Sequence, residues 1–282
     1  MEPGFVARGD ADYPRTLEDL PQPPERLWWI GDLRSLDRPC VAIVGTRGAT
    51  PYGERVTREL AGSLARAGAC VISGMARGID GVAHVATLDA KGVTTAVLGT
   101  GVEIPYPPSH RALHARIAAA GLLLSELAPG EHSHGGSFPK RNRLIAALAR
   151  LTIIVEAPVK SGALHTSRIA NELGRDVAVV PGPIDAPQSE GSNLLLRDGA
   201  HPITSAADAL SLMGLTPAVR TLFDPDDPDQ ARVWRALREG PADLDTLCHR
   251  ASLPVQRCLA AVTALEISGS IECALTGEVR KR

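Results

Sequence analysis

Short apolar segments of strand length recur through most of the chain and alternate with helical patterns. Six such runs occur, at residues 41–45, 70–74, 94–99, 122–126, 151–157 and 176–182. Continuous apolar runs of this length are typical of strands that helices cover on both faces of a sheet. Strands that alternate with helices at this spacing predict an α/β fold with a doubly wound, mostly parallel sheet.

The alternating pattern ends at a stretch that is rich in proline and aspartate. Residues 216–228 contain three prolines and three aspartates, a composition typical of a linker. We therefore expect a main domain over 41–215, preceded by a lead-in over 1–40 that packs on it. A second domain over 229–282 contains three helical patterns and a hairpin-like tail, which together outline a winged helix.

The charge of residues 229–282 does not distinguish a DNA-binding domain from one that contacts another protein. Eight basic residues stand against seven acidic ones in 229–282, so a protein-contact role is as open as DNA binding.

Composition narrows the class of protein. The net charge of −2 argues against a surface coated in basic residues, although a local basic cluster remains possible. No apolar stretch is long enough for a membrane span, and the N-terminus lacks the apolar region of a signal peptide, so we expect a cytoplasmic protein. Five scattered cysteines without a CxxC disfavour both structural zinc and a disulfide framework.

Polar loops follow each of the six apolar runs. In open α/β sheets, ligands bind beyond the carboxyl ends of the strands, near a change of strand order. These loops are rich in glycine, small hydroxyl residues and basic residues, so together they predict a rim that binds anions. The alternative is that the glycines merely close tight turns.

The sequence patterns of common enzymes are missing. The first loop, GTRGAT, has Arg47 where a dinucleotide fingerprint has its second glycine, and no GxxxxGK[ST] or GxSxG occurs. The pair His132 and His134 alone is a weak indication of a metal. Three loop serines have no evident His/Asp partners: Ser133, Ser137 and Ser161. We therefore expect no catalytic residue, no metal and no cofactor.

Four polar residues of the helices are expected to play structural or surface roles. Asp80 falls in the first turn of a helix, where a carboxylate favours the positive end of the helix dipole. His84 lies further along the same helix, where a buried polar contact fits. His110 and His114 are spaced i,i+4 without a nearby acidic motif, and we interpret them as surface residues.

The segment FPKRNRLIAALAR, residues 138–150, carries the strongest electrostatic signal. Lys140, Arg141 and Arg143 begin a helix whose partial positive charge disfavours cations, and the segment contains no acid. A bound polyanion would offset this repulsion. Phe138 adds a ring beside the cations in a chain with only 3% aromatic residues, and rings beside cations are typical of single-strand nucleic-acid binding.

An alternative interpretation of the same segment needs no ligand. In it, Phe138 fills the core and the arginines pair with acidic side chains elsewhere in the fold. The candidates are Glu126, Glu131 and Glu156.

Several of these motifs occur together, and in this order, in the DNA-processing protein A (DprA, or Smf) family, which the chain resembles from about Tyr13 to Leu210. They are VAIVGTRGATPYG, SGMARGIDGVAH, AVLGTGVEIPYP, FPKRNRLIA, IVEAPVKSGAL and VPGPIDAPQSEGSNLLLRDGA. The resemblance implies an extended Rossmann-like domain that binds single-stranded DNA and loads the RecA recombinase during natural transformation. It also implies a homodimer, often with a C-terminal winged helix.

Carried over by motif, the resemblance implies these DNA contacts: Gly45, Thr46, Arg47, Phe138, Lys140, Arg141, Asn142, Arg143, Lys160, Ser161, Gly162, Thr166 and Arg168. We expect Arg47→Ala, or Arg141→Ala with Arg143→Ala, to weaken single-strand binding and to leave the fold intact.

A nucleotide-acting hydrolase on a related scaffold remains an alternative, although PGPIDAP stands where such enzymes carry PGGxGTxxE. A dinucleotide-dependent oxidoreductase is a third.

Overall fold

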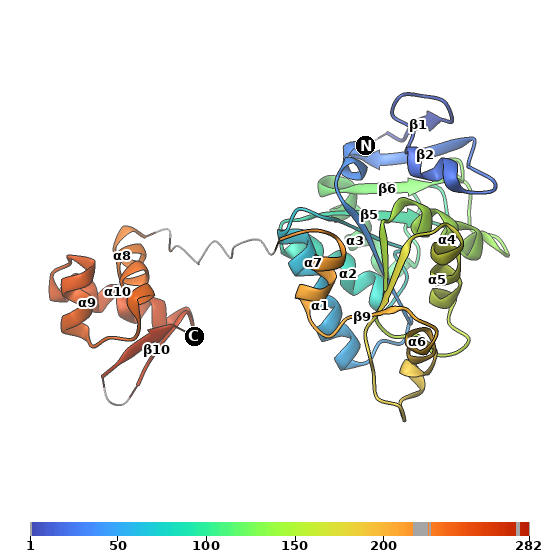
Figure 1. The fold of residues 1–282 in the computed structure, drawn as a ribbon. Helices are drawn as coiled ribbons and strands as arrows, with labels where there is room; N and C mark the ends of the chain where they lie inside the picture. The colour runs from blue at the N-terminus through green and yellow to red at the C-terminus, as the bar shows by residue number, and fades with distance from the viewer. Residues whose placement is uncertain (1, 217–224, 226, 275–276, 282) are drawn as a thin grey trace. The chain divides into compact units, whose positions relative to one another are not determined.

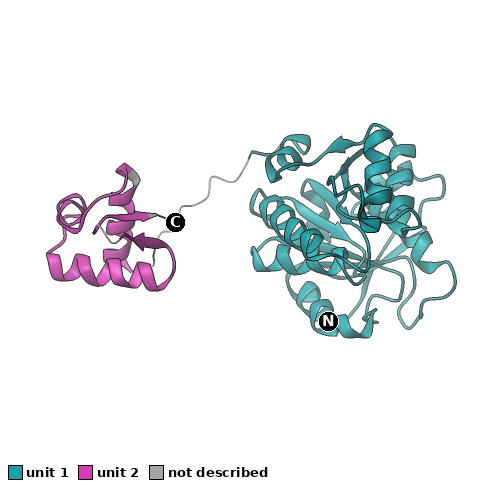
Figure 2. Cartoon of the chain, turned by 90° about the horizontal axis from the view of Figure 1, so that it is seen from below, with its two compact units in different colours: residues 1–218 teal, residues 219–282 magenta. Residues whose placement is uncertain are grey.

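A computed structural model describes residues 2–216, 225, 227–274 and 277–281, and the chain divides into two compact units, residues 1–218 and 219–282 (Figures 1 and 2). Most of the linker expected at 216–228 lies outside the described residues. The two units are described separately below.

The first unit is built on one sheet, which has nine strands in the described part of the chain, in the order β1-β2-β6-β5-β4-β3-β7-β8-β9. Their bounds are β1 (Gly4–Ala7), β2 (Arg26–Gly31), β3 (Cys40–Val44), β4 (Cys70–Ser73), β5 (Val93–Leu98), β6 (Leu122–Ser125), β7 (Leu151–Ile154), β8 (Asp176–Val179) and β9 (His201–Pro202). In this spatial order, every neighbouring pair of strands between β6 and β9 is parallel, which includes β5, β4, β3, β7 and β8. The chain runs outward from β3 to β6 and then returns to β7 on the other side of β3, so the order reverses between β3 and β7.

The N-terminal lead-in contributes to this sheet directly. Its strands β1 and β2 form an antiparallel pair, and β2 pairs antiparallel with β6. The sequence predicted only that this lead-in packs on the main domain. Its strands were not predicted, because β1 is short and β2 joins the sheet through a partner that is distant in sequence.

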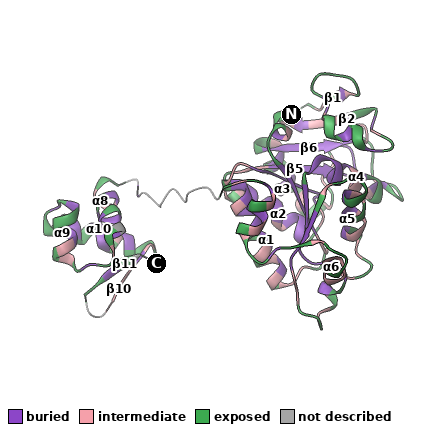
Figure 3. Cartoon of the chain, in the orientation of Figure 1, coloured by how far each residue is buried: buried purple, intermediate pink, exposed green. Residues whose placement is uncertain are grey.

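Helices cover both faces of the sheet, as the apolar runs predicted (Figure 1). On one face lie α1 (Pro51–Arg66), α2 (Ile79–Asp89), α3 (Arg111–Ala120) and α7 (Ala206–Leu212); on the other lie α4 (Ser137–Leu148), α5 (Gly162–Glu172) and α6 (Pro187–Arg197). Along β3, Val41 and Ile43 pack toward Leu60 of α1, whereas Ala42 and Val44 join the cluster that contains α4. Figure 3 shows the strands buried between the two helix layers.

The second unit is a winged helix, which confirms the sequence prediction. It contains α8 (Pro228–Ala236), α9 (Leu244–Ala251), α10 (Val255–Ile267) and a hairpin of β10 (Ile271–Cys273) with β11 (Val279–Lys281). Its core joins all three helices to the hairpin through Val233, Leu247, Cys258, Leu265 and Ile271.

The buried histidine of α2 has a defined tautomer. His84 is fully buried with Nδ1 2.7 Å from Thr94 Oγ1, which confirms the expected polar contact. Thr94 donates its own hydrogen to the Val71 carbonyl, so it must accept from Nδ1–H. Nε2 has no hydrogen-bond partner among the described residues. Protonation there would bury an unpaired N–H, and burial lowers the pKa of His84 to about 3.

We expect this histidine to destabilise the fold in acid. Between pH 6.5 and 3 the unfolded chain takes up a proton at residue 84 that the native state does not, so the free energy of unfolding falls as the pH drops. The loss between pH 7 and pH 5 is roughly 2 kcal/mol. Urea denaturation at pH 7, 6 and 5 measures it. His84→Asn, which keeps a donor for Thr94, should flatten the dependence; parallel curves for the two proteins would contradict this assignment.

The histidines near α3 are less exposed than the sequence suggested. His114 is buried and its Nε2 lies 2.8 Å from the Val102 carbonyl, so its prediction as a surface residue was wrong. His110 Nδ1 lies 3.0 Å from the Met75 carbonyl. The loop after β5 folds back over the start of α3, and a spacing of four residues within one helix does not reveal such a cover.

Candidate nucleic-acid interface

A pocket of about 360 Å³ lies where the strand order reverses, between the loops that follow β3 and β7. We call it the switch-point pocket. Its walls come from the loop 45–47 after β3, from 138–142 of α4, and from 160–163, where α5 begins. This is the place at which an open parallel sheet is expected to bind a ligand. The helix N-terminus of α5 adds a partial positive charge.

Most of the predicted site residues meet here. The pocket is lined by Gly45, Thr46, Arg47, Phe138, Arg141, Asn142, Lys160, Ser161, Gly162 and Thr166. The other three predicted residues, Lys140, Arg143 and Arg168, do not line it. Whether any of them touches DNA stays a prediction.

Two cations of the pocket are free to meet an anion. Arg47 and Lys160 are both exposed, and among the described residues neither has a hydrogen bond or an ion pair with an acidic side chain. The Arg47 guanidinium carbon lies 5.9 Å from the centre of the Phe138 ring. This contact places a positive charge beside an aromatic face.

The Phe138 ring is held at the rim by a glycine. A side chain at Gly99 would bring its Cβ within 2.8 Å of the ring, so the ring packs directly on the backbone that follows β5. Phe138 is half-buried, and it is therefore neither a core plug nor a free surface ring. The half-buried position leaves part of the ring open to the pocket.

Arg141 plays a different part from its neighbours, because it is buried. Its Nη1 donates to the carbonyl of Gly74, at 2.6 Å, and to the carbonyl of Val97. These carbonyls lie at the carboxyl ends of β4 and β5. Burial lowers the pKa of Arg141 to about 10, so the group keeps its charge at neutral pH.

The buried carboxylate of Asp80 supplies the counter-charge. It accepts from the backbone N–H of Gly74 at 3.1 Å and from that of Ala76 at 3.4 Å. Burial raises the pKa of Asp80, whereas the charge of Arg141 lowers it. Asp80 lies in the first turn of α2 as expected, but the sequence did not indicate this pair.

Lys140 and Arg143 turn away from the pocket toward Glu126. Arg143 Nη2 lies 2.7 Å from a Glu126 oxygen, and Lys140 Nζ lies 3.3 Å from it. Arg143 also donates to the Gln22 carbonyl and thereby ties α4 to the N-terminal lead-in. The pairing of Arg143 with Glu126 is one that the ligand-free alternative predicted; whether Lys140 or Arg143 also contacts DNA stays a prediction. Arg168 lies on α5, 3.5 Å from Glu172.

These contacts explain how α4 begins with a run of cations. Arg141 is held by two carbonyls and by the buried carboxylate of Asp80. Lys140 and Arg143 share the carboxylate of Glu126. The expectation that Arg141→Ala with Arg143→Ala leaves the fold intact is not consistent with this arrangement, since both side chains brace it.

The small residues of the loops are mainly structural. A Cβ at Gly45 would approach Ile79 Cγ1 to 2.6 Å, and the backbone N–H of Thr46 donates to the Glu156 carbonyl at 2.7 Å. Ser161 caps α5 by accepting from the N–H of Ala163. Ser137 accepts from the N–H of His134 at 3.0 Å. These hydroxyls cap backbone groups.

A carboxylate occupies the start of α1, where a Rossmann fold binds the pyrophosphate of a dinucleotide. Glu156 is buried and accepts from Thr50 through both its backbone N–H and its hydroxyl. A side chain at Gly53 would collide with this carboxylate. The position is thus filled by the protein's own anion, which weighs against the oxidoreductase alternative.

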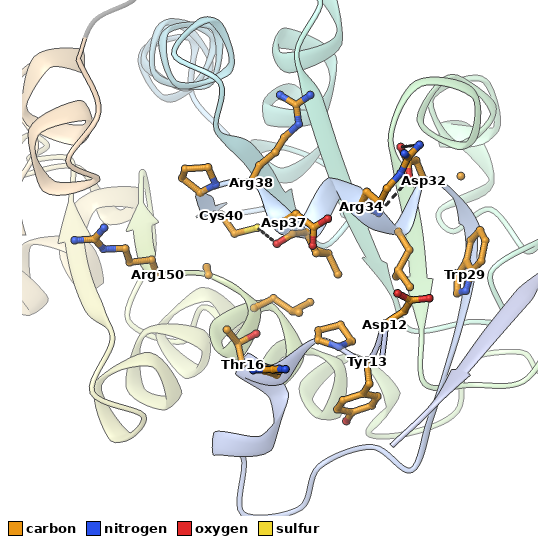
Figure 4. A pocket seen from close by; sticks show the side chains of 18 of the residues that line it. Asp12, Tyr13, Thr16, Trp29, Asp32, Arg34, Asp37, Arg38, Cys40 and Arg150 are labelled. Atoms are coloured by element: carbon orange, nitrogen blue, oxygen red, sulfur yellow. Dashed lines mark hydrogen bonds and ion pairs between the residues drawn. The ribbon is translucent and has the colours of Figure 1, made fainter. Parts of the chain in front are cut away.

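Another hollow of the first unit lies at the opposite, amino-terminal edge of the sheet. It has a volume of about 700 Å³ (Figure 4). Five arginines line it, but three aspartates line it as well. Arg34 pairs with Asp32 at 3.1 Å, and Arg175 pairs with Asp19. The formal charge of this lining is +2, as in the switch-point pocket, but two of its arginines are already paired with aspartates.

No group of three or more metal-ligating side chains occurs among the described residues. Within the same residues, no helix has the length and apolarity that crossing a membrane requires.

Comparisons with known proteins find family matches over most of the chain. The family described as DNA recombination-mediator protein A matches residues 4–214, and the DprA winged helix domain matches 216–274. The Smf protein of Synechocystis is 43% identical over 219 residues, which are 76% of this chain and 55% of that protein. The chain thus spans little more than half the length of this relative.

Two solved structures are similar to the first unit. DprA of Streptococcus pneumoniae has 38% identity and a TM-score of 0.72, covering 74% of this chain and 73% of that one. DprA of Helicobacter pylori, whose structure concerns a single-stranded DNA binding mode, has 33% identity and a TM-score of 0.69 over 75% of this chain and 95% of that one.

Proposed function

Because this chain belongs to the DNA recombination-mediator protein A family, we propose that it binds single-stranded DNA in the switch-point pocket and acts as a mediator of recombination. The observation that carries the proposal is that Arg47 and Lys160, neither of which has an ion pair among the described residues, line one pocket together with the half-buried Phe138 ring. Cations that contact phosphates, beside a ring that stacks on a base, bind single strands with little preference for sequence.

In this proposal the protein is not an enzyme. It protects exposed or incoming single strands and delivers them to the RecA recombinase, in transformation and in recombination. It works as a homodimer in the cytoplasm, where those strands and the recombinase occur. Support for a binding role comes from the loop serines, since Ser137 and Ser161 cap backbone groups and have no hydrogen bond to a histidine side chain among the described residues. Incubation with nucleoside monophosphates, with a search for released base, tests the hydrolase alternative.

The proposal is tested by filter binding of single- and double-stranded oligonucleotides over a salt series, with the mass of the protein measured in parallel. We expect tighter binding of the single strand and a logarithmic salt slope of about 0.7 for each phosphate contact. Equal affinity for both forms, or a slope near zero, would contradict it. A mass of one chain would contradict the homodimer but not the DNA site.

A further inference from the structure

A second hollow adjoins the switch-point pocket on the side of β4 and β5. It has a volume of about 310 Å³, and we call it the aromatic pocket. It shares Arg47, Phe138 and Arg141 with the switch-point pocket, so these side chains form the partition between the two. Both pockets also contact Ala76. The other walls come from Gly74 and Arg77, which follow β4, and from the residues 106–109, which follow β5.

The aromatic pocket has the chemistry of a nucleobase site. Tyr106 is 42% exposed, and its ring centre lies 5.0 Å from that of Phe138 at an interplanar angle of 35°, so the two rings form one continuous aromatic wall. None of the residues that line the pocket, all of them described, is acidic. Arg77 is exposed and, among the described residues, has no hydrogen bond or ion pair.

The order of the strands places the free cations in a row. Arg77, Arg47 and Lys160 follow β4, β3 and β7, which are consecutive neighbours in the sheet. Neighbouring strands lie about 4.8 Å apart, so the row extends over roughly 10 Å. At a rise of about 3.4 Å per nucleotide this corresponds to about three intervals between successive phosphates, and to fewer in an extended strand.

Building on the proposed function, we propose that the aromatic pocket binds the nucleotide next to the one in the switch-point pocket. The strand crosses the carboxyl edge of the sheet from Lys160 over Arg47 to Arg77. One base lies against the face of Phe138 in the switch-point pocket, and the next stacks on Tyr106. Arg77 contacts the phosphate of this second nucleotide.

Two variants test the second nucleotide site separately. Tyr106→Ala should weaken binding of oligo(dT) about tenfold, a typical effect of one lost stacking partner, while Tyr106→Phe retains it. Arg77→Ala should lower the salt slope by about 0.7, because one phosphate contact is lost. The matched controls are Phe5→Ala, an exposed ring on β1, and Arg38→Ala, an exposed arginine at the opposite edge. Both controls should bind as the unmodified protein does.

An abasic strand distinguishes stacking from a merely structural role of Tyr106. The unmodified protein should lose affinity when the bases are removed, and Tyr106→Ala should lose much less. If Tyr106 only supported the fold, its removal would weaken binding of both strands equally. Photocrosslinking with 5-iododeoxyuridine oligonucleotides, followed by peptide mapping, should place adducts on Tyr106 as well as on Phe138.

The experiments distinguish a failure of the second nucleotide site from a failure of the proposed function. If Tyr106→Ala and Arg77→Ala leave affinity and salt slope unchanged while Arg47→Ala weakens binding, the aromatic pocket is not a nucleotide site, although the switch-point pocket remains one. If the unmodified protein shows no preference for single strands, the proposed function itself fails.

Discussion

Replacing Arg47 and Lys160 together by alanine should weaken the binding of single-stranded DNA several hundredfold. Each side chain supplies a charge-assisted contact to a phosphate, worth about 2 kcal/mol, and a tenfold change in affinity corresponds to about 1.4 kcal/mol. The salt slope should fall by about 1.4, which is 0.7 for each lost contact. Both side chains are exposed, and neither has an ion pair among the described residues, so the thermal unfolding temperature should stay within a few degrees.

The chain offers a control with the same change in net charge. Arg38 and Arg150 are exposed arginines that line the large hollow at the amino-terminal edge, and neither has an ion pair among the described residues (Figure 4). Replacing both by alanine should leave the affinity within about twofold. If the control weakens binding as much as the first variant does, the effect comes from the overall charge of the protein and not from the switch-point pocket.

Arg141→Met should destabilise the first unit by about 3–5 kcal/mol, a large part of the stability of a typical domain. The substitution leaves the carbonyls of Gly74 and Val97 without their donor and leaves the Asp80 carboxylate buried without its counter-charge. Arg141→Lys should recover only part of the loss, because a single ammonium lacks the planar fork of a guanidinium. Urea denaturation, followed by circular dichroism, measures these losses.

A second substitution checks the physical reason. Asp80→Asn in the Arg141→Met background removes the uncompensated charge and should restore part of the lost stability. Lys140→Ala serves as the neighbouring control and should change the free energy of unfolding by no more than about 0.5 kcal/mol, since its side chain is exposed. A destabilisation of the same size by Lys140→Ala would show that α4 is generally sensitive at this position.

The sequence was sufficient to predict the central sheet and its helices. An apolar run such as 151–157 is buried on both sides whatever packs on it, so a local pattern carries the information. The strands β1 and β2 were not predicted, because β1 has only four residues, of which one is buried, and β2 joins the sheet by an antiparallel pairing with β6 that is distant in sequence.

The site was predictable in its location but not in the roles of its cations. A run of basic residues shows charge, but only the fold determines which side chains meet an acid or a carbonyl. Arg141 points inward and Arg143 reaches Glu126, whereas Arg47 stays free. Tyr106 and Arg77 were missed because each stands alone in its loop. Their signal is the strand order, which brings the loops after β4 and β5 beside the loop after β3.

The anchoring of Arg141 has a consequence for the thermodynamics of binding. Strand-end carbonyls hold its guanidinium, so the partition between the two pockets is ordered before any ligand arrives. Less conformational entropy is then lost on association, and the heat-capacity change should reflect the apolar area that becomes covered, without a contribution from coupled folding. The Arg141 guanidinium should therefore keep the same position whether or not a strand occupies the pockets beside it.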